Sequence, residues 1–234
     1  METILSINHV SKSFKGKAVL QDISFSLQKG EIVGLLGVNG AGKSTCMKII
    51  SGLYKPSEGK VTLLQQEPFT QWEQLYNQVG ILLEPSIPPH LTANEFLKQI
   101  ALLKGDQEVN LQQLLTTCGL KEVGRKKIKH YSFGMKQRLG LAAALIGNPS
   151  FLMLDEPFVG LDPIGIRDLQ QLLQQLASQG TTILLSSHQL SEVATIVERI
   201  LFIQNGRVMH DIQNGPNINL QALFEDNEVE RCVN

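Results

Sequence analysis

A glycine-rich stretch between a buried strand and a helix is the feature that most constrains this chain of 234 residues. The apolar run at 32–36, Ile-Val-Gly-Leu-Leu, predicts a strand buried on both faces. The motif G-x-x-x-x-G-K-S follows at 37–44, and Met47, Ile49 and Ile50 then continue as the apolar positions of a helix. A strand, a glycine loop and a helix in this order predict a phosphate-binding loop in an α/β fold.

The physical reason lies in the backbone of such a loop. Glycines let the chain wrap closely enough for several N–H groups to point at phosphate oxygens, and the following helix adds its positive end. We expect Lys43 to neutralise the β- and γ-phosphates of ATP and the Ser44 hydroxyl to bind Mg²⁺. The nucleotide-binding residues expected in this segment are Gly37, Asn39, Gly40, Ala41, Gly42, Lys43, Ser44 and Thr45.

Two acidic residues follow a second buried strand. The run 151–154, Phe-Leu-Met-Leu, is followed directly by Asp155 and Glu156. Such a strand delivers both carboxylates to the carboxyl end of the sheet, where ligands of α/β proteins bind. We expect Asp155 to hold Mg²⁺ and Glu156 to orient or deprotonate the attacking water. The alternative is an ordinary helix cap, because Asp-Glu-Pro also starts helices.

The rest of the chain completes a prediction of the fold. After residue 150, apolar strands (151–154, 181–186, 200–203) alternate with helices (167–177, 190–197), which predicts a parallel sheet covered by helices. The first third reads as strands, and Thr92 with Glu95 forms a capping-box pattern that starts a mostly helical middle. We therefore expect one domain of class α/β with a P-loop NTPase core. Its parts are a mostly parallel sheet, an N-terminal antiparallel β subdomain, an inserted helical subdomain at about 86–147 and a C-terminal tail at about 211–234.

Composition excludes several other classes. A net charge of −1 argues against a nucleic-acid-binding surface. No apolar run approaches the roughly 18 residues of a membrane-spanning helix, and the N-terminus lacks a signal-peptide pattern. The three cysteines (Cys46, Cys118, Cys232) are too far apart to indicate a disulfide framework or a zinc site. These features predict a cytoplasmic protein.

Further motifs make the chain resemble the ATP-binding subunits of ABC transporters over essentially its whole length. Residues 132–138, Ser-Phe-Gly-Met-Lys-Gln-Arg, resemble the family signature, and Arg138 precedes Asp155 by 17 positions, an interval similar to the family's. Residues 160–162, Gly-Leu-Asp, look like its D-loop. The resemblance implies nucleotide contacts by Ser132, Gly134 and Asp162, a γ-phosphate contact by the switch histidine His188, and stacking of adenine on Phe14. It also implies that Glu156, His188 and Lys43 are the catalytic residues.

Some of these assignments have alternatives, and the sequence departs from the family pattern in places. Phe14 could be a core residue and His188 a structural histidine. Phe133 stands where the signature usually has glycine, and Met135 where it often has glutamine. Glu84 replaces the usual glutamine of the Q-loop; it has the same reach, so we expect it near Mg²⁺ and the water, but its charge repels phosphate when the metal is absent.

The resemblance also implies partners. Two cassettes arranged head to tail would clasp ATP between the phosphate loop of one and the signature of the other. A multi-span permease would hold the pair at the cytoplasmic face of the cell membrane. The signature region, and Leu220–Phe224 as a short terminal helix, look like the branch of bacitracin-resistance and lantibiotic-immunity exporters, which implies export of a peptide antibiotic. The alternative is an ABC-type ATPase that is not coupled to transport; a P-loop kinase or GTPase does not explain residues 132–138.

Overall fold

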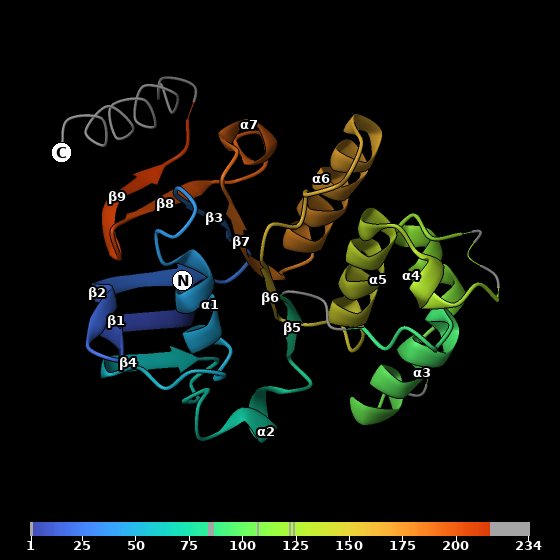
Figure 1. Cartoon of the computed structure of the whole chain (residues 1–234), viewed down its shortest axis with the longest axis horizontal. Coiled ribbons are helices and arrows are strands. Elements are labelled where there is room, and N and C mark those ends of the chain that lie inside the picture. Colours follow the sequence, from blue (N-terminus) through green and yellow to red (C-terminus); the bar gives the residue numbers. More distant parts are fainter. Residues whose placement is uncertain (1, 84–86, 107, 122, 124, 216–234) are drawn as a thin grey trace.

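Two β-sheets and the helices around them make up the protein. The structure, a computed structural model, describes residues 2–83, 87–106, 108–121, 123 and 125–215 (Figure 1). A six-stranded sheet has the order β5-β6-β7-β3-β8-β9, and a three-stranded sheet has the order β2-β1-β4. The strands are β1 (Thr3–Phe14), β2 (Lys17–Gln28), β3 (Ile32–Leu36), β4 (Glu58–Leu63), β5 (Val79–Leu82), β6 (Phe151–Leu154), β7 (Thr182–Ser187), β8 (Arg199–Gln204) and β9 (Arg207–Gln213). The helices are α1 (Lys43–Ile50), α2 (Trp72–Leu75), α3 (Ala93–Leu103), α4 (Leu111–Thr117), the 3₁₀ helix η1 (Ile128–His130), α5 (Phe133–Leu145), α6 (Pro163–Ser178) and α7 (Leu190–Val193).

The six-stranded sheet is parallel except at one edge, as the alternation of strands and helices predicts. Strands β5, β6, β7, β3 and β8 run parallel, and β9 pairs antiparallel with β8. Every residue of β3, β6 and β7 is buried, which explains the uninterrupted apolar sequences of β3 and β6 and the apolar centre of β7. In register, Leu36 lies beside Ser187 and Leu154 beside Leu185. The segments that follow these three strands therefore all leave the sheet on the same side, at the carboxyl ends of the parallel strands.

The antiparallel sheet at the N-terminus shares a hydrophobic core with the parallel one. Strand β1 pairs with both β2 and β4, and its inward residues are buried. Helix α1 contributes Met47 and Ile50 to a cluster that also contains Ile7, Leu184 and Leu201. Helix α1 is thus enclosed between the two sheets, and its first turn is fixed relative to both.

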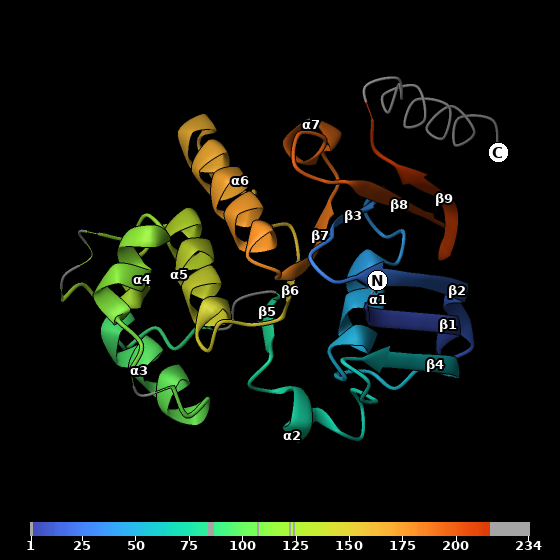
Figure 2. The ribbon, with the colours of Figure 1, turned by 180° about the vertical axis from the view of Figure 1, so that it is seen from behind.

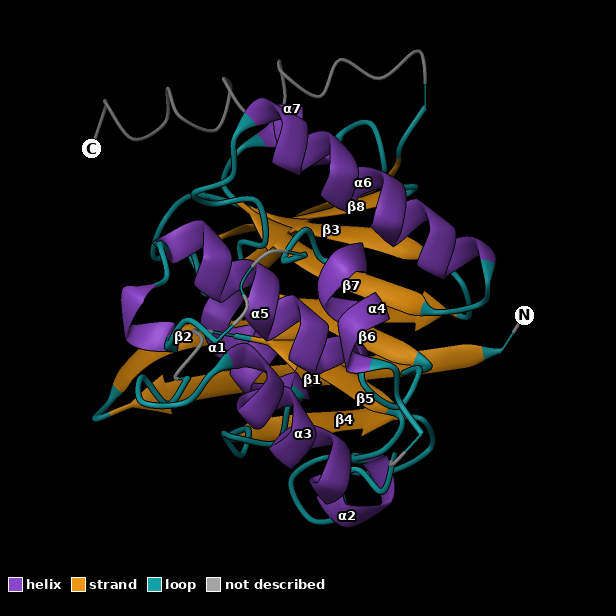
Figure 3. Cartoon of the chain, turned by 90° about the vertical axis from the view of Figure 1, so that its right-hand side faces the viewer, coloured by secondary structure: helices purple, strands orange, loops and turns teal. Residues whose placement is uncertain are grey.

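The segment between β5 and β6 is helical, which confirms the expected insertion. Figures 1 and 2 show α3, α4 and α5 on the opposite side of β5 and β6 from α1, and Figure 3 shows α5 and α6 in front of the six-stranded sheet. The capping box forms as predicted: the Thr92 hydroxyl accepts the Glu95 N–H, and the Glu95 carboxylate accepts the Thr92 N–H at 2.7 Å.

Element boundaries differ from the sequence expectation in three places. Helix α6 begins at Pro163, four residues early, because Asp162 caps it; helix α7 ends at Val193. Strand β9 lies partly in the range expected to be a tail. Its hairpin turns on Asn205 and Gly206, both with positive φ, which is the Asn-Gly signal for a tight turn. The expected terminal helix Leu220–Phe224 lies outside the described residues. None of the helices in the described ranges combines the length and the hydropathy that crossing a lipid bilayer requires.

Gly80 on β5 sets how closely the helical insertion packs on the sheet. A Cβ at this position would lie 2.3 Å from the carbonyl oxygen of Ala144 on α5. We expect Gly80→Ala to push α5 away from β5 and to lower the free energy of unfolding by about 1–3 kcal/mol, measured by chemical denaturation. Gly215→Ala is the matched control, because its Cβ would meet no atom within 4 Å. A Gly80→Ala variant as stable as that control would contradict this account of the packing.

Candidate functional site

The glycine loop joins β3 to α1 and adopts a backbone that side chains would block. Gly37 has φ 152°, and a Cβ there would lie 2.2 Å from the carbonyl oxygen of Ile203. Gly42 has φ 113°, and its Cβ would lie 2.7 Å from a methyl group of Leu20. Glycine is therefore required at both positions, and it allows α1 to begin directly at Lys43. The loop has the form that wraps a phosphate group.

Lys43 is a buried cation inside this loop. Its ammonium group donates to the carbonyl oxygens of Gly37 at 2.7 Å and Val38 at 3.3 Å. Its Nζ atom also lies 3.8 Å from Oε1 of Glu156. Burial lowers the pKa of Lys43, while the charges of Glu156 and Asp155 act in the opposite direction. The ammonium group thus sits where additional negative charge would stabilise it.

The two acids after β6 are held by a residue of the neighbouring strand β7. The Ser186 hydroxyl donates to Oδ1 of Asp155 at 2.5 Å and accepts the Glu156 N–H at 2.9 Å. Glu156 has φ 48°, a costly conformation for a residue with a side chain. Sequence reasoning missed the role of Ser186, although a hydroxyl at the end of an otherwise apolar buried strand is a signal for it.

His188 lies against Glu156. Its Nδ1 atom is 2.8 Å from Oε2 of Glu156, so this carboxylate has an imidazole on one oxygen and Lys43 near the other. Next to it, the Ser187 hydroxyl approaches the Glu192 carboxylate at 3.3 Å, and burial raises the pKa of Glu192. Sequence reasoning missed Glu192. The structure therefore brings Lys43, Asp155, Glu156 and His188 together at one edge of the sheet.

The remaining residues of the loop are consistent with nucleotide and metal binding. Ser44 is exposed at the first turn of α1, and Gly40 at the tip of the loop has open space around its Cα atom. Asn39, Ala41 and Thr45 lie in the same segment. Among the described residues, no group of three His, Cys, Asp or Glu side chains could hold a metal ion by itself. Mg²⁺ at Ser44 and Asp155 would need oxygens from phosphate or water, which suits the metal of a nucleotide complex.

Phe14 is at the surface, which argues against the alternative that it is a core residue. Its side chain is 38% exposed, and its ring packs edge-on against Tyr54 with centroids 5.4 Å apart. Tyr54 lies in turn beside Lys48 of α1, whose Nζ atom is 5.9 Å from the ring centroid. Stacking of adenine on Phe14 stays a prediction.

The signature residues lie apart from the phosphate loop. Ser132 caps α5 by accepting the Met135 N–H, and Asp162 caps α6 by accepting the Gly165 N–H. The two helix starts touch, because a Cβ on Gly134 would lie 2.7 Å from the carbonyl oxygen of Gly160. Figures 1 and 2 show α5 and α1 on opposite sides of β5 and β6, so one copy of the chain does not close Ser132 over its own loop. Glu84 lies outside the described residues, and its expected role is untested.

Known proteins are similar to this chain in sequence and in fold. The family model described as "ABC transporter" matches residues 20–159. The lantibiotic transport ATP-binding protein SrtF of Streptococcus pyogenes is 36% identical, with 95% of this chain and 96% of that protein covered. The bacitracin transport ATP-binding protein BcrA of Enterococcus faecalis is 39% identical over 91% of this chain and 70% of that protein.

Solved structures of ATP-binding cassettes are similar to this chain in fold. An ATP-binding subunit of an ABC transporter superposes with a TM-score of 0.82 at 29% identity, covering 97% of this chain and 94% of the other. A dimeric ATP-binding cassette in a post-hydrolysis state with ADP and Pi gives a TM-score of 0.83 at 26% identity, covering 91% and 99%. The family match spans more than half of the chain, and it includes the phosphate loop and both acids. The chain belongs to the ABC transporter family as one of its ATP-binding subunits.

Proposed function

We propose that this subunit hydrolyses Mg-ATP between two cassettes and thereby drives a separate membrane permease. The observation that carries the proposal is the buried Lys43 ammonium group, 3.8 Å from a carboxylate of Glu156 that His188 also contacts. A cation, a general base and an imidazole at the mouth of a glycine loop are the groups that transfer of a phosphoryl group to water requires.

The chemistry follows from the position of each group. Water attacks the γ-phosphoryl group in line, the bond between phosphorus and the bridging oxygen of ADP breaks, and ADP and phosphate leave. Glu156 orients the water and accepts its proton, while Lys43 and His188 stabilise the charge on the phosphoryl oxygens. Ser44 and Asp155 would hold Mg²⁺, which would supply positive charge beside the phosphates when bound.

A second copy, or a related cassette, completes the site. Ser132 and Gly134 start a helix on the far side of β5 and β6 from the loop, so only another chain could present them to the same ATP. The Ser132 hydroxyl accepts the Met135 N–H at 3.2 Å, which leaves its own hydrogen available for a phosphate oxygen. Support comes from the solved cassette whose dimer contains ADP and Pi.

The names of the relatives support a transport role and suggest a substrate class. SrtF is named for lantibiotic transport and BcrA for bacitracin transport. We infer that this subunit works at the cytoplasmic face of the cell membrane and powers export of a peptide antibiotic or a similar amphipathic molecule. Copurification of this subunit with a multi-span membrane protein would support the proposal. If the subunit instead hydrolyses ATP in its cell without binding any permease, the alternative of an ABC-type ATPase that is not coupled to transport would be favoured.

Replacement of Glu156 separates binding from turnover. Glu156→Gln removes the base but keeps the size of the side chain, so we expect ATP affinity to be retained and hydrolysis to fall about 100-fold or more. Dimers should accumulate with ATP, since the γ-phosphate that joins the two halves persists. Steady-state phosphate release and light scattering measure the two effects.

Glu192→Gln is the control for this variant. Glu192 lies on the same edge but contacts Ser187 rather than the base. We expect this variant to keep most of its turnover. Normal hydrolysis by Glu156→Gln would remove Glu156 from the role assigned to it.

Ser132→Ala tests the contribution of the second cassette. Loss of the hydroxyl should lower turnover about tenfold, while ATP affinity of the monomer stays nearly unchanged, because the hydroxyl acts on the nucleotide of the partner. Nucleotide fluorescence titration under monomeric conditions and an ATPase assay measure these quantities.

The control must account for the helix cap that Ser132 also provides. Asn110→Ala removes the equivalent cap from α4, where the Asn110 side chain accepts the Gln113 N–H at 3.0 Å. We expect similar destabilisation but normal turnover. If Ser132→Ala instead lost monomer ATP binding, the arrangement across two chains would be contradicted.

A further inference from the structure

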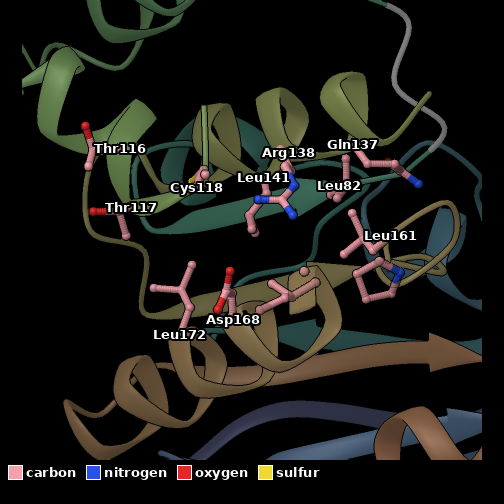
Figure 4. A pocket seen from close by; sticks show the side chains of 14 residues that line it. Leu82, Thr116, Thr117, Cys118, Gln137, Arg138, Leu141, Leu161, Asp168 and Leu172 are labelled. Atoms are coloured by element: carbon pink, nitrogen blue, oxygen red, sulfur yellow. The ribbon is translucent and has the colours of Figure 1, made fainter. Parts of the chain in front are cut away.

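A cavity separate from the phosphate loop lies between the helical insertion and α6. It has a volume of about 230 Å³ and is bounded by α4, α5, α6 and the end of β5. Figure 4 shows its lining side chains converging from these elements. Thr116, Thr117 and Asp168 line it and are exposed, so the cavity reaches the surface and a small molecule could enter.

The walls of this cavity are mostly apolar. Leucine side chains from β5, α5, α6 and the loop before α6 form them, together with Pro157: Leu82, Leu141, Leu161, Leu169 and Leu172. Such a surface favours an aliphatic body over bulk water. The polar groups in the cavity are few and therefore specify its ligand.

The side-chain oxygen of Gln137 is a hydrogen-bond acceptor that no described residue donates to. Its side chain is 6% exposed, and its Oε1 atom is buried without a hydrogen-bond partner among the described residues. A buried carbonyl oxygen in this state is unfavourable unless a ligand or water supplies an O–H or N–H group. Figure 4 places Gln137 at one end of the cavity, beside Leu82 and Leu161.

Arg138 provides a cation that forms no ion pair with the described residues. Two glycines make room for its guanidinium group: a Cβ on Gly119 would lie 1.8 Å from one terminal nitrogen, and a Cβ on Gly165 would lie 2.3 Å from the other. Among the described residues, no carboxylate forms an ion pair with it, although Asp168 faces it across the cavity (Figure 4) and the Asp162 carboxylate also lies beside Gly165. The Asp168 carboxylate is exposed, so water screens its negative charge more strongly than it screens the positive charge of the Arg138 guanidinium group. A planar fork of donors in this position suits a carboxylate.

We propose that this cavity binds a short aliphatic acid that carries a hydroxyl or amino group away from its carboxylate. The carboxylate pairs with Arg138, the aliphatic chain lies on the leucine walls, and the distal O–H or N–H donates to Oε1 of Gln137. An occupant would touch α5 and α6, whose first turns carry the Ser132 and Asp162 caps. The site does not depend on ATP, so the proposal stands or falls separately from the proposed function.

Three probes dissect the site on the full chain without nucleotide. Calorimetry and saturation-transfer NMR would compare 6-hydroxyhexanoate with hexanoate, which lacks the donor, and with 1-hexanol, which lacks the carboxylate. We expect 6-hydroxyhexanoate to bind about 3–10-fold more tightly than hexanoate and at least about tenfold more tightly than 1-hexanol. Equal binding of all three, or no binding of 6-hydroxyhexanoate, would overturn the proposal.

Three variants locate the binding. Leu172→Trp fills the cavity and should abolish binding, whereas Gln171→Trp, on the exposed face of the same helix, should not. Gln137→Met keeps the shape but removes the unpaired oxygen, so we expect the Tm of the free protein to rise by about 2–4 °C and the preference for 6-hydroxyhexanoate over hexanoate to disappear. Unchanged binding by Leu172→Trp, or a Tm lowered by Gln137→Met, would show that the cavity or its acceptor has been misassigned.

Discussion

The site depends on a lysine ammonium group held out of water beside two carboxylates. Lys43 is 6% exposed, and burial of a charge is unfavourable unless other groups compensate. Two loop carbonyls and the carboxylate of Glu156 compensate in part. A triphosphate, with several negative charges, would compensate far more fully. The fold thus buries an ammonium group that the phosphates of a nucleotide can stabilise. The glycines of the loop leave the space in which a phosphate group can approach this ammonium group.

Positioning of that lysine requires both sheets. Helix α1 is packed between the antiparallel and the parallel strands, which fixes Lys43 at its first turn. Strands β6 and β7 are in parallel register, so Ser186 can bind the backbone of Glu156 and the side chain of Asp155 together. His188 is the first residue after the end of β7, and its imidazole contacts the Glu156 carboxylate. Side chains far apart in sequence meet because neighbouring parallel strands end at one edge.

Much of this arrangement is predictable from sequence, because it rests on local patterns. The buried runs at 32–36 and 151–154 became β3 and β6, and the Thr92 capping box starts α3 as expected. Cross-strand contacts were harder: Ser186 reads as part of an apolar strand, and only the register with β6 reveals its two hydrogen bonds. Strand β9 was missed although Asn205-Gly206 signals its turn, because its residues alternate between exposed and half-buried and none of them is buried. The Oε1 atom of Gln137, which has no hydrogen-bond partner among the described residues, cannot be read from sequence at all, since its burial depends on how α5 packs against the rest of the fold.

The claim that two chains share each ATP is tested most directly by mixing two variants that are each impaired in turnover. A dimer of Lys43→Ala with Ser132→Ala has one site in which both residues are altered and one in which both are intact, whereas each variant alone has none intact. We predict that the mixture hydrolyses ATP faster than the sum of the two separate variants, with a rate that peaks near equal amounts. A mixture that only adds the two residual rates would contradict the shared site.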